Sequence, residues 1–266
     1  MISQNSQSSA RQHPGDLDDR ARPIVAVAVD HPGPHFLPPH GHFRAQLVYA
    51  PAGVMTVVTA TGTWVVPPQQ AVWMPAGVEH EVRSAVPLAL RSLYVHPDAT
   101  VGLPEACCVV GVPPLLRELI LRAVTFGEQV APGGPEARLL ALIPDELRAL
   151  EPEPLHLPLP RDRRLTAVTE RLAADPADGR PLAAWARAAG ASERTLARLF
   201  LQETGLTFGA WRQRLRLLAA IARLAEGQSV TGVAYDLGYD SPSAFVAMFR
   251  RALGATPGRY LKGRPE

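Results

Sequence analysis

The chain has 266 residues, of which 47% are hydrophobic and 20% are charged, and its formal net charge is +2. This length exceeds one ordinary small domain and suffices for two packed cores. No apolar run reaches the about 18 residues that span a bilayer, and the polar N-terminus lacks the apolar core of a secretory signal, so we expect a cytoplasmic protein without a membrane partner.

The charge is distributed unevenly along the chain. Residues 1–160 hold 10 basic and 15 acidic side chains, whereas residues 161–266 hold 17 basic and 10 acidic ones. Neutralising the phosphates of a nucleic acid requires such a basic region, because counterion release supplies most of the non-specific affinity. A solvated basic surface would give the same count, so charge alone leaves both interpretations open.

The N-terminal part has the pattern of a β-domain. Residues 1–22 lack periodic hydrophobic residues and are predicted to be a disordered tail. Many short strand-like runs follow, separated by turns with glycine or proline, and this spacing predicts a sandwich or barrel. The expected strands are Ile24–Val29, Phe43–Tyr49, Val54–Ala60, Thr63–Val66, Ala71–Met74, Glu79–Arg83 and Leu88–Val95.

Helical periodicity replaces the strand pattern after these runs. We expect two apolar helix faces to pack on the barrel, with one of them available to a partner subunit in a homodimer. Residues 151–160 hold four prolines and are predicted to be a semi-rigid linker between domains at 23–150 and 161–266. The two helix faces consist of Leu115, Leu116, Leu119, Ile120 and Val124, and of Leu139, Leu140, Ile143, Leu147 and Leu150.

A repeat in the C-terminal part is the most informative pattern of the sequence. Two copies with identical spacing, 49 residues apart, predict two helix-turn-helix units, with Thr207–Glu226 as a long helix between them. The first residue of each copy, Ser192 or Ser241, is placed to cap a helix. The copies are Ser192, Phe200, Gly205, Thr207, Gly209, Trp211 and Ser241, Phe249, Gly254, Thr256, Gly258, Tyr260.

The second helix of such a unit enters the major groove of DNA with its N-terminal residues on the bases. Arg194 and Arg198 share an outward face, and arginine donates to guanine O6 and N7 together. We therefore expect the first unit to supply more sequence information and the second more positioning. An exposed arginine can also be no more than a good helix former. The expected DNA contacts are Ser192, Glu193, Arg194, Thr195, Ala197 and Arg198, and Ser241, Pro242, Ser243, Ala247, Arg250 and Arg251.

Residues 163–262 resemble the DNA-binding domain of AraC/XylS-type transcription regulators. The resemblance implies operator binding through both units, and many relatives carry a basic or long polar residue where Ala247 stands, which argues against strong base reading by the second unit. The implied base-contacting positions are Arg194, Ala197, Arg198, Pro242, Ser243 and Ala247. The motifs that carry the resemblance are Ser192–Phe200, Glu203–Gly205, Val233–Phe245 and Thr256–Tyr260.

Two stretches of the N-terminal part resemble the metal-binding motifs of cupin barrels, namely His40-Gly41-His42 with Gln46, and Pro75–His80. The resemblance assigns His40, His42 and His80 to a three-histidine site, with neutral Gln46 in place of the carboxylate. On one strand, His40 and His42 would point to the same face. Imidazole suits Zn, Ni, Co, Cu or Fe, so any cofactor would be a divalent transition metal. Regulators of this family often keep the barrel without metal and bind a small organic effector instead.

These patterns together predict a multidomain α+β protein. A cupin-like β-barrel with flanking helices would precede an all-α domain with two helix-turn-helix units joined by a long helix. The predicted function is sequence-specific transcription regulation, with the barrel sensing a small molecule or a metal ion. The expected partners are double-stranded operator DNA, the effector, RNA polymerase and a second copy of the chain. The alternatives are a metal-dependent cupin enzyme, for which the site lacks an acid, and a ligand-independent DNA-binding protein, which would not need the barrel.

Overall fold

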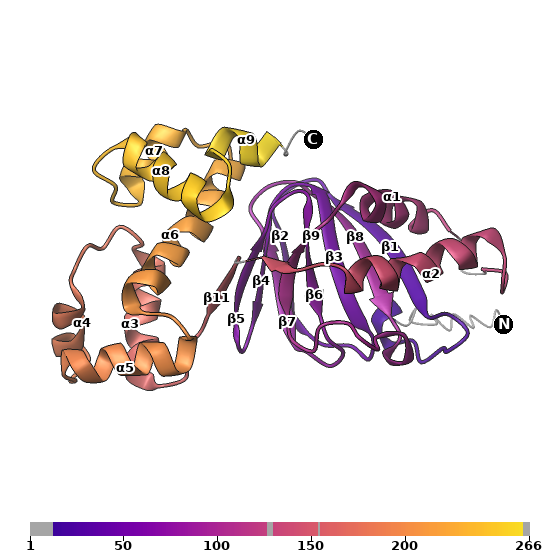
Figure 1. Cartoon of the computed structure of the whole chain (residues 1–266), viewed down its shortest axis with the longest axis horizontal. Coiled ribbons are helices and arrows are strands. Elements are labelled where there is room, and N and C mark those ends of the chain that lie inside the picture. The colour runs from indigo at the N-terminus through magenta and orange to yellow at the C-terminus, as the bar shows by residue number, and fades with distance from the viewer. Residues whose placement is uncertain (1–12, 127–129, 154, 263–266) are drawn as a thin grey trace, which may run out of the picture.

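The computed structural model describes residues 13–126, 130–153 and 155–262. It has an N-terminal β-barrel with two helices on one side and a C-terminal domain made only of helices, as predicted (Figure 1). Within the described ranges, no helix has both the length and the apolar character needed to cross a bilayer.

Two antiparallel sheets form the barrel. Their strand orders are β1-β8-β3-β6-β9-β10 and β11-β5-β4-β7-β2. The strands are β1 (Ile24–His31), β2 (His35–His40), β3 (Ala45–Ala52), β4 (Met55–Thr59), β5 (Gly62–Val66), β6 (Gln70–Met74), β7 (His80–Ser84), β8 (Leu88–Val95), β9 (Cys108–Gly111), β10 (Pro152–Glu153) and β11 (His156–Pro158).

The larger sheet is covered on both faces. Along β3, Val48 points into the barrel core while Leu47 and Tyr49 belong to a second apolar cluster outside the sheet. Helices α1 (Pro114–Ala123) and α2 (Pro135–Arg148) close this second cluster and lie against the sheet in Figure 1. Both predicted helix faces therefore pack on the barrel, except for Leu115, which is 55% exposed, and the half-buried Val124, which lies outside the cluster.

Four strands were not predicted from the sequence: β2, β9, and the short strands β10 and β11 that replace the expected linker. The prolines within β2 argued against a strand there, and the four prolines at 151–160 suggested a connection without strand pairing. Strands β2, β10 and β11 all lie at sheet edges, where a missing backbone N–H leaves no interior hydrogen bond unmade. Leu155 and Leu157 are buried and fix the former linker to the core.

The predicted disordered tail is wrong for residues 13–22, which lie on the barrel. A short 3-10 helix, Pro14–Asp16, has the buried Gly15 in its centre. The carbonyl of Gly15 accepts from the backbone N–H of Arg44 at 2.8 Å. Residues 1–12 of the expected tail lie outside the described residues.

The C-terminal domain consists of two helical units at the two ends of α6, which Figure 1 shows running from the lower to the upper unit. The repeat in the sequence is a repeat in space, because Phe200 meets Trp211 at 6.0 Å between ring centroids and the equivalent Phe249 meets Tyr260 at 5.6 Å. The helices are α3 (Arg163–Ala174), α4 (Leu182–Ala188), α5 (Glu193–Thr204), α6 (Phe208–Ala225), α7 (Val230–Asp236), α8 (Pro242–Leu253) and α9 (Pro257–Lys262).

The two domains share one continuous apolar core. Strand β11 pairs with β5 of the barrel, and it also contacts α6, where Trp211 Nε1 donates to the carbonyl of Pro158 at 2.9 Å. Arg214 on the same helix donates to the carbonyl of His156 at 3.3 Å. The segment that the sequence suggested as a spacer therefore holds the long helix against the barrel.

Candidate DNA-reading helices and a histidine cluster

Helix α5 begins and ends as the first repeat copy predicts. The hydroxyl of Ser192 accepts from the backbone N–H of Thr195 at 3.1 Å, which satisfies one of the free N–H groups of the first turn. At the other end Gly205 has φ +68°, a left-handed conformation that glycine adopts without strain. Local chemistry thus defines both ends of the helix.

The predicted outward face of α5 is open to solvent. Glu193, Arg194 and Arg198 are exposed, whereas Leu196 and Phe200 are fully buried. Thr195 and Ala197 are half-buried. Arg198 Nη1 donates to Gln202 Oε1 at 2.7 Å, so this guanidinium lies along the helix and would exchange that bond for a DNA contact.

Helix α8 repeats this construction with different outward residues. The Ser241 hydroxyl accepts from the N–H of Ala244 at 3.2 Å, and Gly254 ends the helix with φ +73°. Ser243 and Ala247 are exposed near its N-terminus, and Pro242 is half-buried. Arg250 and Arg251, also exposed, lie in the last turn and are suited to backbone phosphates rather than to bases at the N-terminal end.

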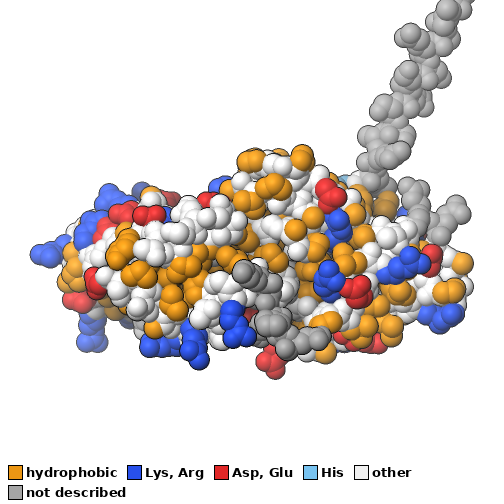
Figure 2. Space-filling view, turned by 90° about the horizontal axis from the view of Figure 1, so that it is seen from above, with side chains coloured by type: hydrophobic (Ala, Val, Ile, Leu, Met, Phe, Trp, Pro, Cys, Tyr) orange, Lys and Arg blue, Asp and Glu red, His pale blue; other side chains and the backbone are white. Residues whose placement is uncertain are grey.

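Basic side chains collect at the end of the molecule that carries these helices. In Figure 2 blue arginine and lysine atoms are most frequent over the C-terminal domain on the left, further blue atoms lie over the barrel on the right, and the middle shows mainly orange and white atoms. This distribution follows the charge asymmetry of the sequence. A positive surface around two groove-sized helices matches the electrostatics of a DNA-binding face.

The three predicted histidines meet at one end of the barrel. His40 ends β2, His80 begins β7, and the two are partners in the sheet register. His42 lies in the turn after β2, so it is not on the same strand as His40, as the sequence had suggested. One ring nitrogen of each histidine lies within 4.8 Å of the others.

The backbone orients each of these imidazoles in the same way. His40 Nδ1 lies 2.9 Å from the carbonyl of Pro38, His42 Nδ1 lies 2.6 Å from that of Arg44, and His80 Nδ1 lies 2.9 Å from that of Val78. A carbonyl can only accept, so each Nδ1 donates and each neutral ring keeps its lone pair on Nε2. A histidine whose second nitrogen is held in this manner is the usual form of a metal ligand.

His80, at the buried end of the cluster, has a ring nitrogen that accepts no hydrogen bond from the described residues. His80 is 2% exposed, and its Nε2 has no hydrogen-bond partner among the described residues. Burial lowers the pKa of His80 to about 4, against a smaller opposing effect of the Val78 carbonyl. The ring is therefore neutral at physiological pH and ready to accept a cation without losing a proton.

Gln46 faces the cluster from β3. Its Oε1 lies 3.0 Å from His42 Nε2, and its Nε2 donates to Ser92 Oγ at 3.2 Å. With the proton of His42 on Nδ1, His42 Nε2 and Gln46 Oε1 are both acceptors and face each other. This is favourable if both bind the same cation, or if the amide of Gln46 is flipped so that its NH₂ group donates to His42 Nε2. The amide of Gln46 therefore lies next to the histidine cluster.

Sequence reasoning missed three residues that support the cluster. Arg44 is fully buried, Gly15 packs against His42, and the ring of Tyr94 meets that of His42 edge-on at 5.3 Å. Burial raises the pKa of Tyr94 to about 12, so its phenol stays neutral. The one signal in the sequence was an arginine two residues after the His-x-His motif. Its burial, which makes it structurally important, could not be read from the sequence.

Comparison with known proteins agrees with this architecture. A family profile described as an AraC-like ligand binding domain matches residues 23–125, and one described as a helix-turn-helix domain matches residues 185–263. The HTH-type transcriptional regulator NimR of Escherichia coli strain K12 is 40% identical over 224 residues, which cover 84% of this chain and 82% of NimR.

Two further matches share less with this chain. The HTH-type transcriptional regulator RipA of Corynebacterium glutamicum is 39% identical over 107 residues, or 40% of this chain and 32% of RipA. The crystal structure of fatty-acid-bound ToxT from Vibrio cholerae aligns with 90% of this chain and 94% of its own at a TM-score of 0.38 and 11% identity. The two relatives found by sequence are regulators rather than enzymes, as predicted for this chain. With an N-terminal ligand-binding domain and a C-terminal helix-turn-helix domain, the chain belongs to the AraC family of transcription regulators.

Proposed function

We propose that this regulator binds operator DNA through α5 and α8 and that its barrel senses a divalent transition metal ion at His40, His42 and His80. The observation that carries the metal proposal is the common orientation of the three imidazoles, each with Nδ1 held by a backbone carbonyl. The family assignment supports DNA as a partner but leaves the sensed ligand open.

The residues present fit such an ion. Three neutral imidazoles and an amide oxygen are donors that suit Zn, Ni, Co, Cu or Fe, and Gln46 adds no charge. When bound, the ion would supply a positive charge that links the end of β2, the following turn and the start of β7. The buried acceptor of His80 would then gain the partner that it lacks within the described structure.

A small organic effector at the same wall is the second candidate. Gln46 and Ser92 place a neutral amide and a hydroxyl in the barrel. These groups can form hydrogen bonds to a polar organic molecule as well as lie next to a bound cation. In that case His42 and His80 would act as hydrogen-bonding wall residues, and no ion would be retained.

On the DNA side, Arg194 and Arg198 are proposed to read bases, while Ser243, Arg250 and Arg251 position the second unit on the backbone. A homodimer would raise operator affinity through effective concentration, and the exposed Leu115 and Leu142 on α1 and α2 offer an apolar surface for it. RNA polymerase is the further partner that we expect for a regulator of this family.

The test uses the full chain after removal of metal with a chelator. A duplex is first selected from random double-stranded oligonucleotides, and its affinity is then measured by fluorescence anisotropy with and without Zn²⁺, Ni²⁺ or Co²⁺. The variants are the double substitution His40→Ala/His42→Ala and, as a matched control, His31→Ala/His35→Ala. The control histidines are stacked at 3.5 Å on β1 and β2.

One of these ions should bind the wild type and the control at one equivalent per chain and change their affinity for the duplex, but not bind the cluster variant. Equal metal content in the cluster variant and the wild type would refute the metal site. Failure to select any duplex at low salt would refute the DNA-binding role separately.

A further inference from the structure

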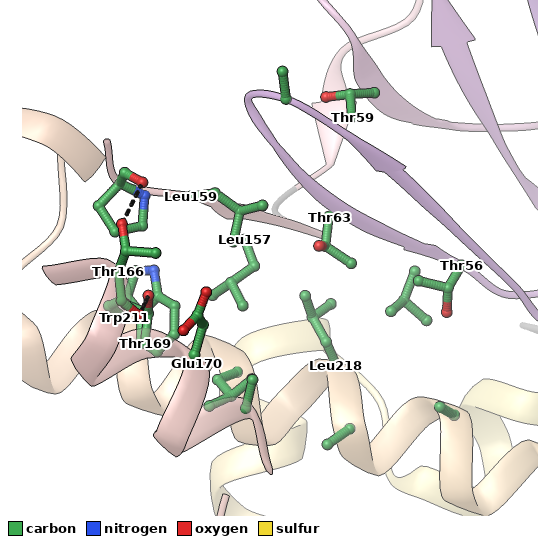
Figure 3. A pocket seen from close by; sticks show the side chains of 17 residues that line it. Thr56, Thr59, Thr63, Leu157, Leu159, Thr166, Thr169, Glu170, Trp211 and Leu218 are labelled. Atoms are coloured by element: carbon green, nitrogen blue, oxygen red, sulfur yellow. Dashed lines mark hydrogen bonds between the residues drawn. The ribbon is translucent and has the colours of Figure 1, made fainter. Parts of the chain in front are cut away.

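A second cavity lies between the barrel and the C-terminal domain, and it shares no residue with the histidine cluster. Its volume is about 470 Å³. Figure 3 shows Thr56 and Thr63 on the barrel side, Glu170 on α3 and Leu218 on α6 facing this space from opposite sides. Small-molecule sites occupy about 300–1,000 Å³ and often lie between domains.

The cavity walls are mainly apolar. Leu157 of β11, Leu159 after it, and Leu215, Leu218 and Trp211 of α6 are among the residues that line it. The hydroxyl of Thr166 donates to the carbonyls of Pro160 and Asp162 before α3, and that of Thr169 donates to the carbonyl of Thr166. Those of Thr56 and Thr63 have no hydrogen bond within the described structure and remain available to a ligand.

Glu170 is the single charged side chain among the residues that line the cavity. In Figure 3 its carboxylate points away from α3 into the space below Leu157. Among the described residues, no basic group lies within ion-pair distance of this carboxylate. Glu170 is an exposed residue, so an ammonium paired with its carboxylate keeps contact with water while the apolar body of the same molecule lies against the leucine walls.

We infer that this cavity binds a small, mainly apolar molecule that carries one ammonium group. The apolar body would displace water from the leucine and tryptophan walls, and the ammonium would donate to Glu170. A carboxylate of the same size would be repelled by Glu170, and a neutral alcohol would lack the charge-assisted bond. The cavity therefore selects amines over isosteric acids and alcohols.

The position of the cavity connects this ligand with the regulator. A molecule in it touches β4 and β5 of the barrel on one side and α3 and α6 of the DNA-binding domain on the other. It would favour the arrangement in which these elements meet, and it would change DNA affinity to the extent that DNA prefers another arrangement. The amine site is thus a second input that does not depend on the metal proposal.

The test is isothermal titration of the full-length, metal-free protein with hexylamine, hexan-1-ol and hexanoate, which share one apolar body. Two variants address the site, Glu170→Gln and Ala222→Leu, the second of which narrows the cavity from α6 with a good helix former. Glu146→Gln on α2 is the matched control for the loss of a carboxylate. No DNA is present, so the result stands apart from the operator experiment.

Hexylamine should bind the wild type and the control saturably and, by about threefold or more, more tightly than hexan-1-ol, with no binding of hexanoate. Glu170→Gln should remove the preference for the amine, and Ala222→Leu should weaken binding of both the amine and the alcohol. Equal affinity for amine and alcohol, absence of saturable amine binding, or amine binding unchanged in both variants would overturn the inference. The ligand series on the wild type decides the question even if a variant fails to fold.

Discussion

His42 and Arg44 connect the histidine cluster to the N-terminal segment. His42 Nδ1 lies 2.6 Å from the carbonyl oxygen of Arg44, whose own side chain is fully buried. The guanidinium donates to the carbonyls of Leu17, Arg22 and Asp19 at 2.7, 2.8 and 2.9 Å. One residue therefore orients a candidate ligand with its backbone and fixes the segment before β1 with its side chain.

Replacing Arg44 with methionine should destabilise the barrel by about 2–4 kcal/mol, because several part-buried carbonyls would lose a charged donor. The packing of the aliphatic part is largely kept, so the loss reports on the hydrogen bonds. Urea unfolding measures the change, and trypsin cleavage after Arg20 should become faster as the segment detaches. Arg117→Met, at an exposed position of α1, serves as the control. A loss equal to that of the control would show that the guanidinium contributes nothing.

Gly15 lets the N-terminal segment approach the cluster. A Cβ built on Gly15 would lie 2.5 Å from Cγ of His42, too close for either group to stay in place. Gly15→Ala should therefore weaken binding of the metal that the wild type takes up by about 10-fold or more, as changes around metal ligands commonly do. Titration of chelated protein with that ion measures the effect.

The control for Gly15 is Gly33→Ala, where an added Cβ meets nothing within 4 Å. Metal affinity should be unchanged in that variant. If Gly15→Ala binds metal as tightly as Gly33→Ala does, the close contact with His42 does not position the ligand.

The two DNA-reading helices should differ in what they contribute. Arg198→Ala should relax the preference at one base pair by about 1–3 kcal/mol, because it removes a bidentate donor. Ser243→Ala should weaken binding to all duplexes alike, since a hydroxyl at a phosphate carries no sequence information. Competition binding to a selected duplex and its single-base variants distinguishes these outcomes, with Arg138→Ala on α2 as the control.

A larger loss of base preference in Ser243→Ala than in Arg198→Ala would reverse the proposed division between the units. The bond of Arg198 to Gln202 offers a further check. Gln202→Ala frees the guanidinium without removing it and should leave the preference intact.

Asp162 makes a pH-dependent contribution at the start of α3. Its carboxylate accepts from the N–H of Arg164 at 2.9 Å and pairs with the Arg164 guanidinium, which lowers the pKa of Asp162 to about 2. Because the folded pKa lies below the usual value of about 3.9, this contribution is complete above pH 4 and is lost as the pH falls toward 2.

Asp162→Ala should accordingly cost about 1 kcal/mol at pH 7, the typical value of a helix cap. In urea unfolding the difference from the wild type should shrink between pH 4 and pH 3. Asp162→Asn retains a capping oxygen and should lose less at pH 7. A constant difference across this range would mean that the charge of Asp162 plays no part.

Local chemistry explains why the C-terminal helices could be predicted. A serine hydroxyl at Ser192 or Ser241 caps its own first turn, and a glycine at Gly205 or Gly254 ends the same helix, so both signals act within a few residues. The same holds for Thr207 before α6. A repeat of such signals predicts the number and type of elements without information from distant parts of the chain.

The barrel was predicted as a class but not in detail, since strand pairing joins distant residues. Because prolines are unusual in central strands, the prolines of these edge strands argued against β2 and suggested a linker where β10 and β11 lie. The burial of Leu155 and Leu157 in that segment became visible only in the structure. The His-x-His motif indicated the histidine cluster, yet His42 reached it from a turn rather than from the strand of His40.

The sequence by itself determined the two helix-turn-helix units, the barrel class and the residues of the histidine cluster, because caps, periodicity and motif spacing are local. Only the tertiary structure decided that Arg44 is buried beside that cluster and that Glu170 faces a cavity between the domains. Burial and cavities depend on contacts between segments far apart in the chain, and a single sequence does not show which segments are in contact.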